Sequence, residues 1–161
     1  MHFSCVASAA HFFIYKGEII MTITTEKRDL FTVPQGYYLA HCISSDFELG
    51  AGIAKTFNSV YNMRYKLFRS YSGYEYIGGD ALPVDNVFNL VTKERYWHKP
   101  TYDTLRAALK SMKEWMGFMS VTKVAMPRIG CGLDKLEWPA VYEIICEVFK
   151  DSDVEILICE L

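Results

Sequence analysis

Residues able to do chemistry gather in the stretch MPRIGCGLDKLEW, residues 126–138. The stretch holds an arginine, a cysteine, an acid and two glycines, whereas a simple connector between a strand and a helix needs only one glycine. Because Gly130 and Gly132 have no side chains, they can leave backbone N–H groups accessible. These groups can bind phosphate oxygens without a positively charged side chain. The same pattern would arise if both glycines only turn the chain and Arg128 is a solvated surface residue. The stretch by itself leaves both interpretations open.

A second glycine-bearing stretch, HCISSDFELGAGIAK, leads from an apolar run into a helical pattern. Gly50 and Gly52 let a ligand approach the backbone closely, and a helix start offers free N–H groups and the positive end of the dipole. The match to G-x-G-x-x-G is incomplete because Lys55 stands where the third glycine would be, and a structural turn explains the stretch equally well. Two such loops beyond the carboxyl ends of strands would suit a diphosphate.

The strands that must position these loops are predicted from Met21 onward, in the runs MTITTE, YYLAHCI, DALPV, NVFNLVTK, VTKVAM and VEILIC. YYLAHCI is almost wholly apolar, as expected of a strand that is buried on both faces. DALPV and NVFNLVTK flank an Asp-Asn turn, which predicts a hairpin and therefore a mixed sheet.

Helical patterns separate the strands. In GAGIAKTFNSVYNM the apolar residues at helical spacing are Ile53, Phe57, Val60 and Tyr61. KPTYDTLRAALKSMKEWMGFM has Thr101 as its predicted N-cap and one apolar stripe, formed by Leu105, Ala108, Leu109, Met112 and Met116. A third helix is predicted from Pro139, over Val141, Ile144, Ile145 and Val148. This alternation predicts one α/β domain with helices on both faces of the sheet.

Composition limits the classes of function. The chain has 161 residues and a net charge of −2, with no dense Lys/Arg cluster, so a nucleic-acid-binding function is disfavoured and an anion must be held by local geometry. Its five cysteines are odd in number and form no C-x-x-C pattern, so neither a disulfide framework nor a zinc site is predicted and a cytoplasmic location is expected. No apolar run approaches the roughly 20 residues of a membrane-spanning helix. We predict no metal and no cofactor.

Residues 1–20 are interpreted as an N-terminal extension to a domain over residues 21–161. The extension is an upstream start, a disordered arm, or an additional edge strand through residues 12–15. The triplet ASA at residues 7–9 imitates a signal-peptidase site, but the segment before it has no Lys or Arg and is too short for an apolar core. Secretion is therefore disfavoured.

Three segments carry a resemblance to a known family: LAHCISSDFELGAGIAKTF, LVTKERYWHKPTYDTL and AMPRIGCGLDKLEW, in this order. Together they resemble macro domains of the terminal ADP-ribose protein glycohydrolase type, which are also similar to yeast ADP-ribose 1″-phosphate phosphatase. Many macro domains share G-A-G-I-A, whereas T-K…H-K-P-T-Y followed by P-R-I-G-C-G-L-D is more specific. The likeness covers residues 21–161. It implies a three-layer α/β/α sandwich with a mixed sheet and ADP-ribose in a cleft between the glycine loops.

The resemblance also implies binding residues. Asp29 would accept hydrogen bonds from the adenine amino group, with Leu30 beside it. The loop for the first phosphate and distal ribose would contain Ser44, Gly50, Ala51, Gly52 and Ile53. The other phosphate loop would contain Pro127, Ile129, Gly130, Cys131 and Gly132. The chain departs from the family at Arg28, where glycine is usual, and in the closing strand ILICEL, which lacks the family's tyrosine although Leu161 matches.

Lys93 matches the family's catalytic lysine and Asp134 its catalytic acid. In that mechanism the lysine amine attacks the anomeric carbon of the distal ribose and displaces a protein carboxylate, and water later releases the imine-type adduct. Asp134 would move protons during ring opening and hydrolysis. Without the resemblance, Lys93 would be read as a solvated strand-end lysine and Asp134 as an acid that complements a helix dipole.

Other polar and aromatic residues have plainer interpretations. His41 is expected to be a hydrogen-bonded core residue, and His98 either a structural histidine or a contact to the distal ribose. Cys131 is expected to pack in a tight loop and not to act as a nucleophile. Tyr96 and Trp97 either line the cleft or only pack against neighbouring residues.

The sequence thus predicts a macro domain that hydrolyses ADP-ribose derivatives at C1″ of the distal ribose. The candidate substrates are ADP-ribose on protein glutamate or aspartate, ADP-ribose 1″-phosphate and O-acetyl-ADP-ribose. The alternative is a reader that binds ADP-ribose without turnover. The expected partners are ADP-ribose and ADP-ribosylated proteins, and a monomer is expected.

Overall fold

The computed structural model describes residues 2–6 and 10–161, so residues 7–9, considered above as a cleavage site, lie outside the described residues. The elements follow in the order β1 (His2–Val6), β2 (Ala10–Tyr15), β3 (Glu18–Lys27), the short 3-10 helix η1 (Leu30–Thr32), β4 (Tyr38–Ser44), α1 (Gly52–Tyr61), α2 (Met63–Ser70), β5 (Asp80–Val84), β6 (Val87–Lys93), α3 (Tyr102–Met119), β7 (Lys123–Met126), α4 (Trp138–Phe149) and β8 (Val154–Glu160).

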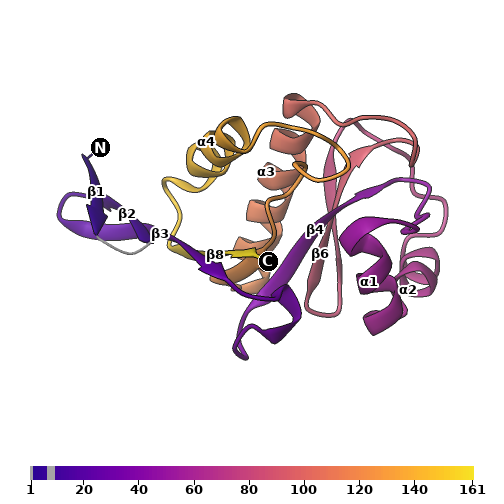
Figure 1. Cartoon of the computed structure of the whole chain (residues 1–161), viewed down its shortest axis with the longest axis horizontal. Coiled ribbons are helices and arrows are strands. Elements are labelled where there is room, and N and C mark those ends of the chain that lie inside the picture. The colour runs from indigo at the N-terminus through magenta and orange to yellow at the C-terminus, as the bar shows by residue number, and fades with distance from the viewer. Residues whose placement is uncertain (1, 7–9) are drawn as a thin grey trace.

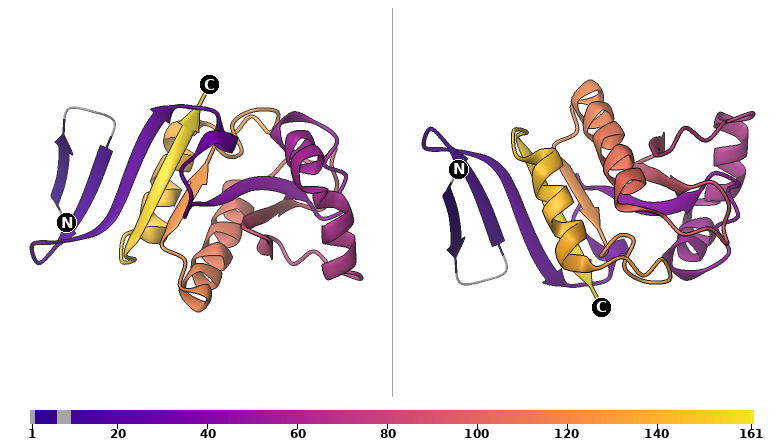
Figure 2. Two further views of the ribbon diagram at one scale, coloured as in Figure 1. Left: turned by 90° about the horizontal axis from the view of Figure 1, so that it is seen from below. Right: turned by 90° about the horizontal axis from the view of Figure 1, so that it is seen from above.

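The strands form one mixed sheet, which in the described part of the chain has eight strands in the order β1-β2-β3-β8-β7-β4-β6-β5 (Figure 2). Strand β4 is parallel to both β6 and β7, and β8 is parallel to β7 and β3. The predicted hairpin is present, since β5 and β6 pair antiparallel across the Asp85–Asn86 turn. Parallel strands end at the same edge of the sheet, so the carboxyl ends of β4, β6 and β7 lie together.

Helices α3 and α4 cover one face of the sheet (Figure 1). The predicted stripe of α3 is buried in full, and so are the four predicted apolar positions of α4. Thr101 begins α3 as predicted: its Oγ1 accepts a hydrogen bond from Thr104 N, and Thr104 Oγ1 accepts one from Thr101 N, each at 3.1 Å. This reciprocal cap satisfies two amides that the helix leaves unpaired.

Helices α1 and α2 cover the opposite face (Figure 1). In this part of the chain the structure differs from the sequence-based prediction in two details. Val60, expected on the buried stripe, is 57% exposed. Helix α2 was not predicted as a separate element. The second difference arises at Asn62, whose left-handed backbone (φ 54°) ends α1 at Tyr61 and starts α2, so that Phe57 of α1 and Met63 of α2 both enter the core.

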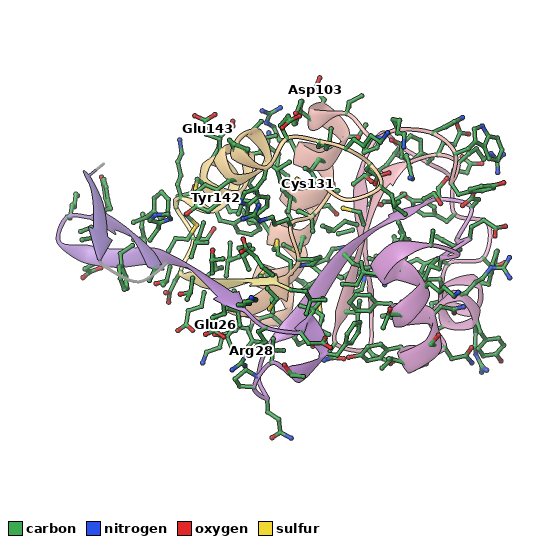
Figure 3. All side chains as sticks on the ribbon, in the orientation of Figure 1. Glu26, Arg28, Asp103, Cys131, Tyr142 and Glu143 are labelled. Atoms are coloured by element: carbon green, nitrogen blue, oxygen red, sulfur yellow. The ribbon has the colours of Figure 1, made fainter. Side chains whose placement is uncertain are left out.

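At the other end of the sheet, the edge strand considered for residues 12–15 is present as β2. It pairs with β3, which begins at Glu18, and the chain before β2 adds β1 outside it. Phe13 of β2 is 1% exposed and packs into the core beneath α4. His11 Nδ1 hydrogen-bonds the hydroxyl of Tyr142 on α4, a residue labelled in Figure 3.

His41, predicted to be a core residue, is fully buried in β4. Its ring stacks on Phe57 with centroids 3.8 Å apart, and its Nε2 lies 2.7 Å from Asn89 Oδ1. Burial, partly offset by the hydrogen bond to Asn89, lowers the pKa of His41 from 6.5 to about 4. The imidazole is therefore neutral in the folded protein at neutral pH.

This burial predicts a specific loss of stability in acid. Between about pH 6.5 and pH 4 the unfolded chain protonates at position 41 while the folded protein does not, so the contribution is complete above pH 6.5 and is lost as the pH falls through that window. Urea unfolding of the parent and of His41→Gln, whose amide can still donate to Asn89, should differ in their loss between pH 7 and pH 5 by about 2 kcal/mol. His98→Gln, at an exposed site, should behave like the parent; the same loss in His41→Gln as in the parent would contradict the assignment.

Candidate functional site

The Lys93 amine and the Asp134 carboxylate meet at the carboxyl edge of the sheet. Lys93 ends β6, and Asp134 lies in the loop between β7 and α4; Nζ and Oδ1 are 2.6 Å apart. Because β4 separates β7 from β6, this loop reaches across the end of β4 to Lys93. Each side chain is only 14% exposed, so the pair is partly shielded from water. One proton can pass between amine and carboxylate at this distance.

The first glycine loop, residues 45–51, connects β4 to α1. Asp46 organises its start, since Oδ1 accepts hydrogen bonds from Ser44 Oγ at 2.5 Å and Glu48 N at 3.2 Å. Helix α1 begins at Gly52, which has φ 56°, and its N-cap residue Ala51 supplies no side-chain hydrogen bond. The amides of the first turn of α1 are thus left for solvent or an anion.

The second glycine loop, residues 127–137, connects β7 to α4. Gly130 has φ 72° and is packed against Leu136, whose backbone N donates to Gly130 O at 2.8 Å. Gly132 differs, because a Cβ placed there would meet no described atom within 4 Å. Gly130 is therefore needed for the turn, whereas Gly132 leaves open space beside the backbone.

Arg128, interpreted above as a solvated surface residue if the glycines only turn the chain, holds the second glycine loop to the sheet. Its Nε donates to Glu160 Oε1 on β8 at 2.6 Å, and its guanidinium lies 5.4 Å from the centroid of the Trp138 ring. Both contacts join the first part of the loop to elements that flank it.

A third segment, residues 94–99 after β6, spans the two glycine loops, and we call it the arch. Near its start, Tyr96 N donates to Asp46 Oδ2 at 2.9 Å. At its end, Lys99 Nζ donates at 2.9 Å to the backbone oxygen of Leu133, the residue before Asp134. The arch therefore fixes both glycine loops relative to Lys93. Sequence reasoning did not single out Asp46 or Lys99; for Lys99 the available signal was its place in the distinctive H-K-P-T-Y block.

The glycine loops also touch each other. A Cβ placed on Gly52 would lie 3.4 Å from Leu133 Cδ1, so the second loop passes over the first turn of α1. Two surface hollows of about 550 and 430 Å³ lie along α3 and α4, lined mainly by charged side chains such as Arg106 and Glu147. Arg106 is ion-paired with Asp103, which Figure 3 labels, and with Glu147, so its charge is already paired there.

The remaining residues implied by the resemblance are spread over different environments. Ser44 and Ile129 are buried, Ile53, Pro127 and Cys131 are partly buried, and Gly50, Ala51 and Gly132 are exposed. Asp29 is exposed and its Oδ1 accepts from Phe31 N at 2.9 Å, whereas Leu30 is buried in the core. Leu161 is 95% exposed.

Arg28, which stands where the family usually has glycine, is held against the end of β3. Its Nε is 3.0 Å from Glu26 Oε2, and both residues are labelled in Figure 3. Its backbone N donates to Glu160 O at 2.8 Å. Cys159, in the closing strand that lacks the family's tyrosine, is buried nearby.

Cys42 on β4 lies beside the Lys93–Asp134 pair, which sequence reasoning did not foresee. Burial first, and the Asp134 carboxylate second, raise the pKa of the Cys42 thiol to about 12. Burial also raises the pKa of the Cys131 thiol. Neither thiol is activated as a nucleophile, because activation requires a lowered pKa.

Neither a metal site nor a membrane-spanning helix is found among residues 2–6 and 10–161. No group of three or more His, Cys, Asp or Glu side chains is placed to hold a metal ion there. No described helix is both long and apolar enough to cross a membrane.

Comparison with known proteins identifies the fold and the family. No protein-family model matches the chain. The ADP-ribose glycohydrolase OARD1 of Bos taurus is 41% identical over 139 residues, which cover 86% of this chain and 91% of the relative. The Homo sapiens protein of the same name is 40% identical over the same shares of both chains. The macrodomain of Thermus aquaticus DarG superposes with a TM-score of 0.74 at 22% identity, over 88% of this chain and 99% of that one.

The three-layer architecture with its mixed sheet is that of a macro domain, which confirms the fold predicted from the sequence. Within that class, the chain belongs to the family of the OARD1 ADP-ribose glycohydrolases.

The two glycines of the second loop should respond differently to alanine. Gly130→Ala places an L-residue in left-handed backbone with Leu136 Cδ1 only 3.0 Å from its Cβ, so the free energy of unfolding should fall by about 1–3 kcal/mol. Gly132→Ala, the matched control, should change it by less than about 0.5 kcal/mol. Chemical denaturation measures both values, and equal losses would be inconsistent with these separate roles.

Proposed function

We propose that this protein is an ADP-ribose glycohydrolase that releases ADP-ribose from protein carboxylates. The observation that carries the proposal is the 2.6 Å contact between Lys93 Nζ and Asp134 Oδ1, at the sheet edge where both glycine loops begin. The OARD1 relatives, which are ADP-ribose glycohydrolases and align over 86% of this chain, support the same reaction class.

Binding would place the diphosphate between the two glycine loops. The uncapped first turn of α1 offers backbone N–H groups and the positive end of the helix dipole, which suits an anion on a chain of net charge −2. The open space beside Gly132 admits a ligand close to the second loop. Leu133, 63% exposed, can move aside from Gly52 without disturbing the core. Asp29 would accept from the adenine amino group at the other end of the ligand.

The first chemical step needs a neutral amine. Asp134 Oδ1, within hydrogen-bond reach of the Lys93 ammonium, takes one of its protons. The Nζ lone pair then forms a bond to C1″ of the distal ribose. The bond from C1″ to the acyl oxygen breaks, and its electron pair leaves with the protein carboxylate. A covalent bond to the enzyme thus replaces the ester.

The second step releases the sugar. Asp134 gives its proton to the ring oxygen as the bond from C1″ to that oxygen breaks, and it takes one from the nitrogen as the C=N bond forms. Water then adds to C1″, the C–N bond breaks, and Lys93 returns to its ammonium form. One proton passes to solvent overall, which balances hydrolysis of an ester to a carboxylate. Both roles of Asp134 depend on its position within reach of Nζ.

A carboxylate is a good leaving group because its charge is delocalised and it needs no proton to depart. ADP-ribose 1″-phosphate and an acetyl ester at C1″ present a leaving group at the same carbon. The same amine can therefore attack them, and we infer that they are secondary substrates.

The proposed role of Lys93 predicts that Lys93→Ala abolishes turnover but leaves the dissociation constant for ADP-ribose within roughly tenfold of the parent, about 1.4 kcal/mol. Release of free ADP-ribose from an auto-ADP-ribosylated protein measures turnover, and calorimetry measures binding. Lys66→Ala is the matched control, since Lys66 forms an ion pair with Asp85 at the β5–β6 turn. Release at the parental rate by Lys93→Ala would contradict the covalent step. A parent that binds ADP-ribose tightly and releases none from the protein would be a reader.

Binding itself should raise thermal stability. At a ligand concentration of 100 times the dissociation constant, the folded state gains about 2.7 kcal/mol, which raises the melting temperature by roughly 5–10 °C. Differential scanning fluorimetry with ADP-ribose measures the shift. Adenosine monophosphate, which lacks the second phosphate and the distal ribose, should give a smaller shift at equal concentration. The absence of any shift with ADP-ribose would remove the basis of the proposal.

A further inference from the structure

The arch exposes large apolar side chains to solvent beside the candidate site. In the described structure all of residues 94–99 are exposed. Tyr96 is 59% exposed and Trp97 63%, and Leu133 across from them is also 63% exposed. The Tyr96 and Trp97 rings meet edge to face at 5.0 Å, and Trp97 meets His98 at 5.5 Å. Exposed apolar side chains that gather beside a functional site are typical of contact surfaces.

The arch does not need these rings for its own conformation. Its position is set by polar contacts, from Tyr96 N to Asp46 and from Lys99 Nζ to Leu133 O, and by Ser45, whose N donates to Lys93 O at 3.0 Å and whose Oγ donates to Glu94 O at 2.7 Å. None of these contacts uses an aromatic ring. The side chains of Tyr96 and Trp97 are therefore available to a binding partner.

We propose that Tyr96, Trp97 and Leu133 form the surface on which the ADP-ribosylated polypeptide packs. The inference rests on the proposed function and adds to it the recognition of the leaving group. The arch begins directly after Lys93, and Leu133 directly precedes Asp134, so all three residues lie within four positions of a member of the ion pair along the chain. Whatever is attached to C1″ must pass this surface, whereas the diphosphate and adenine lie toward the glycine loops.

The charges around this surface favour a polypeptide rich in carboxylates. Arg95 and Lys99 on the arch and Lys135 beyond Leu133 are exposed cations, against two exposed acids, Glu94 on the arch and Glu137 beyond Lys135. This local excess of positive charge stands on a chain whose net charge is −2. Acidic side chains near a modified glutamate or aspartate complement it. A nucleic acid would require a longer basic track to neutralise successive phosphates.

The test compares two ligands in the Lys93→Ala background, in which the ester persists. One ligand is free ADP-ribose, and the other is an acidic peptide that carries ADP-ribose on a glutamate. Tyr96→Ala combined with Trp97→Ala should weaken binding of the modified peptide about tenfold, while binding of free ADP-ribose changes less than twofold. Tyr96→Phe with Trp97→Phe should restore most of the peptide affinity. In the protein with Lys93 intact, Tyr96→Ala combined with Trp97→Ala should lower kcat/KM about tenfold for the modified peptide. The same two substitutions should leave kcat/KM nearly constant for a small acetyl ester at C1″.

The matched control is Phe118→Ala. Phe118 is 84% exposed on α3 and also meets an aromatic neighbour, Trp115, edge to face, but it lies at the far end of its helix from the arch. It should leave both affinities unchanged.

Several outcomes would overturn the proposal. Equal weakening of both ligands would assign the rings to the ADP-ribose site, and no weakening of either would leave them without a binding role. A modified peptide that binds the parent no more tightly than free ADP-ribose would exclude a polypeptide surface. Loss confined to an ADP-ribosylated oligonucleotide would make the partner a nucleic acid. Failure of the glycohydrolase proposal is separate: it would appear as no ADP-ribose release with Lys93 intact, while the affinity ratio still reports on the arch.

Discussion

The ion pair between Lys93 and Asp134 is the interaction on which the site depends. It joins the end of β6 to a loop that starts at β7, two strands that are separated in the sheet by β4. Each partner is only 14% exposed, so removal of one leaves a partly desolvated charge on the other. The same closeness lets one proton move between them. The same contact therefore contributes to holding the loop in place and to the proposed chemistry.

The position of that loop is set by polar contacts to neighbouring segments, because the segments around the pair contain little regular structure. Asp46 joins the first glycine loop to the arch, and Lys99 joins the arch to Leu133, one residue from Asp134. Arg128 holds the same loop to Glu160 on β8. These hydrogen bonds thus connect segments that are distant in sequence and fix their positions around the Lys93–Asp134 pair. The aromatic rings of the arch take no part in these tethers and remain at the surface, which is why we assign them to recognition.

The thiols near the site illustrate how burial decides reactivity. Cys42 lies beside Lys93 and Asp134, but burial and the nearby carboxylate raise its pKa to about 12. A buried thiol beside a carboxylate stays protonated, since both effects disfavour the thiolate. We therefore assign the proposed chemistry at this sheet edge to the Lys93 amine, whose carboxylate partner lies within hydrogen-bond distance, and not to a thiol.

Much of the fold could be predicted from local patterns, because those patterns report burial and backbone geometry directly. The apolar stripe and Thr101 cap of α3, the Asp-Asn hairpin, and the apolar run of β4 all form as predicted. The prediction was wrong where a single residue redirected the chain: Asn62 adopts left-handed backbone, which ends α1 beside the exposed Val60 and starts α2. Left-handed geometry at asparagine is permitted but not required, so composition does not reveal it.

The sequence by itself determined the strand and helix pattern, both glycine stretches, the family resemblance, and the two residues proposed for catalysis. Only the tertiary structure decided which glycine turns the chain, that Arg128 holds a loop, that Asp46 and Lys99 connect the loops to the arch, and that Cys42 borders the pair. The physical reason is separation along the chain. Asp46 and Tyr96 are joined by one hydrogen bond, as are Lys99 and Leu133, but strand order in the sheet, which local patterns do not encode, is what brings each pair together.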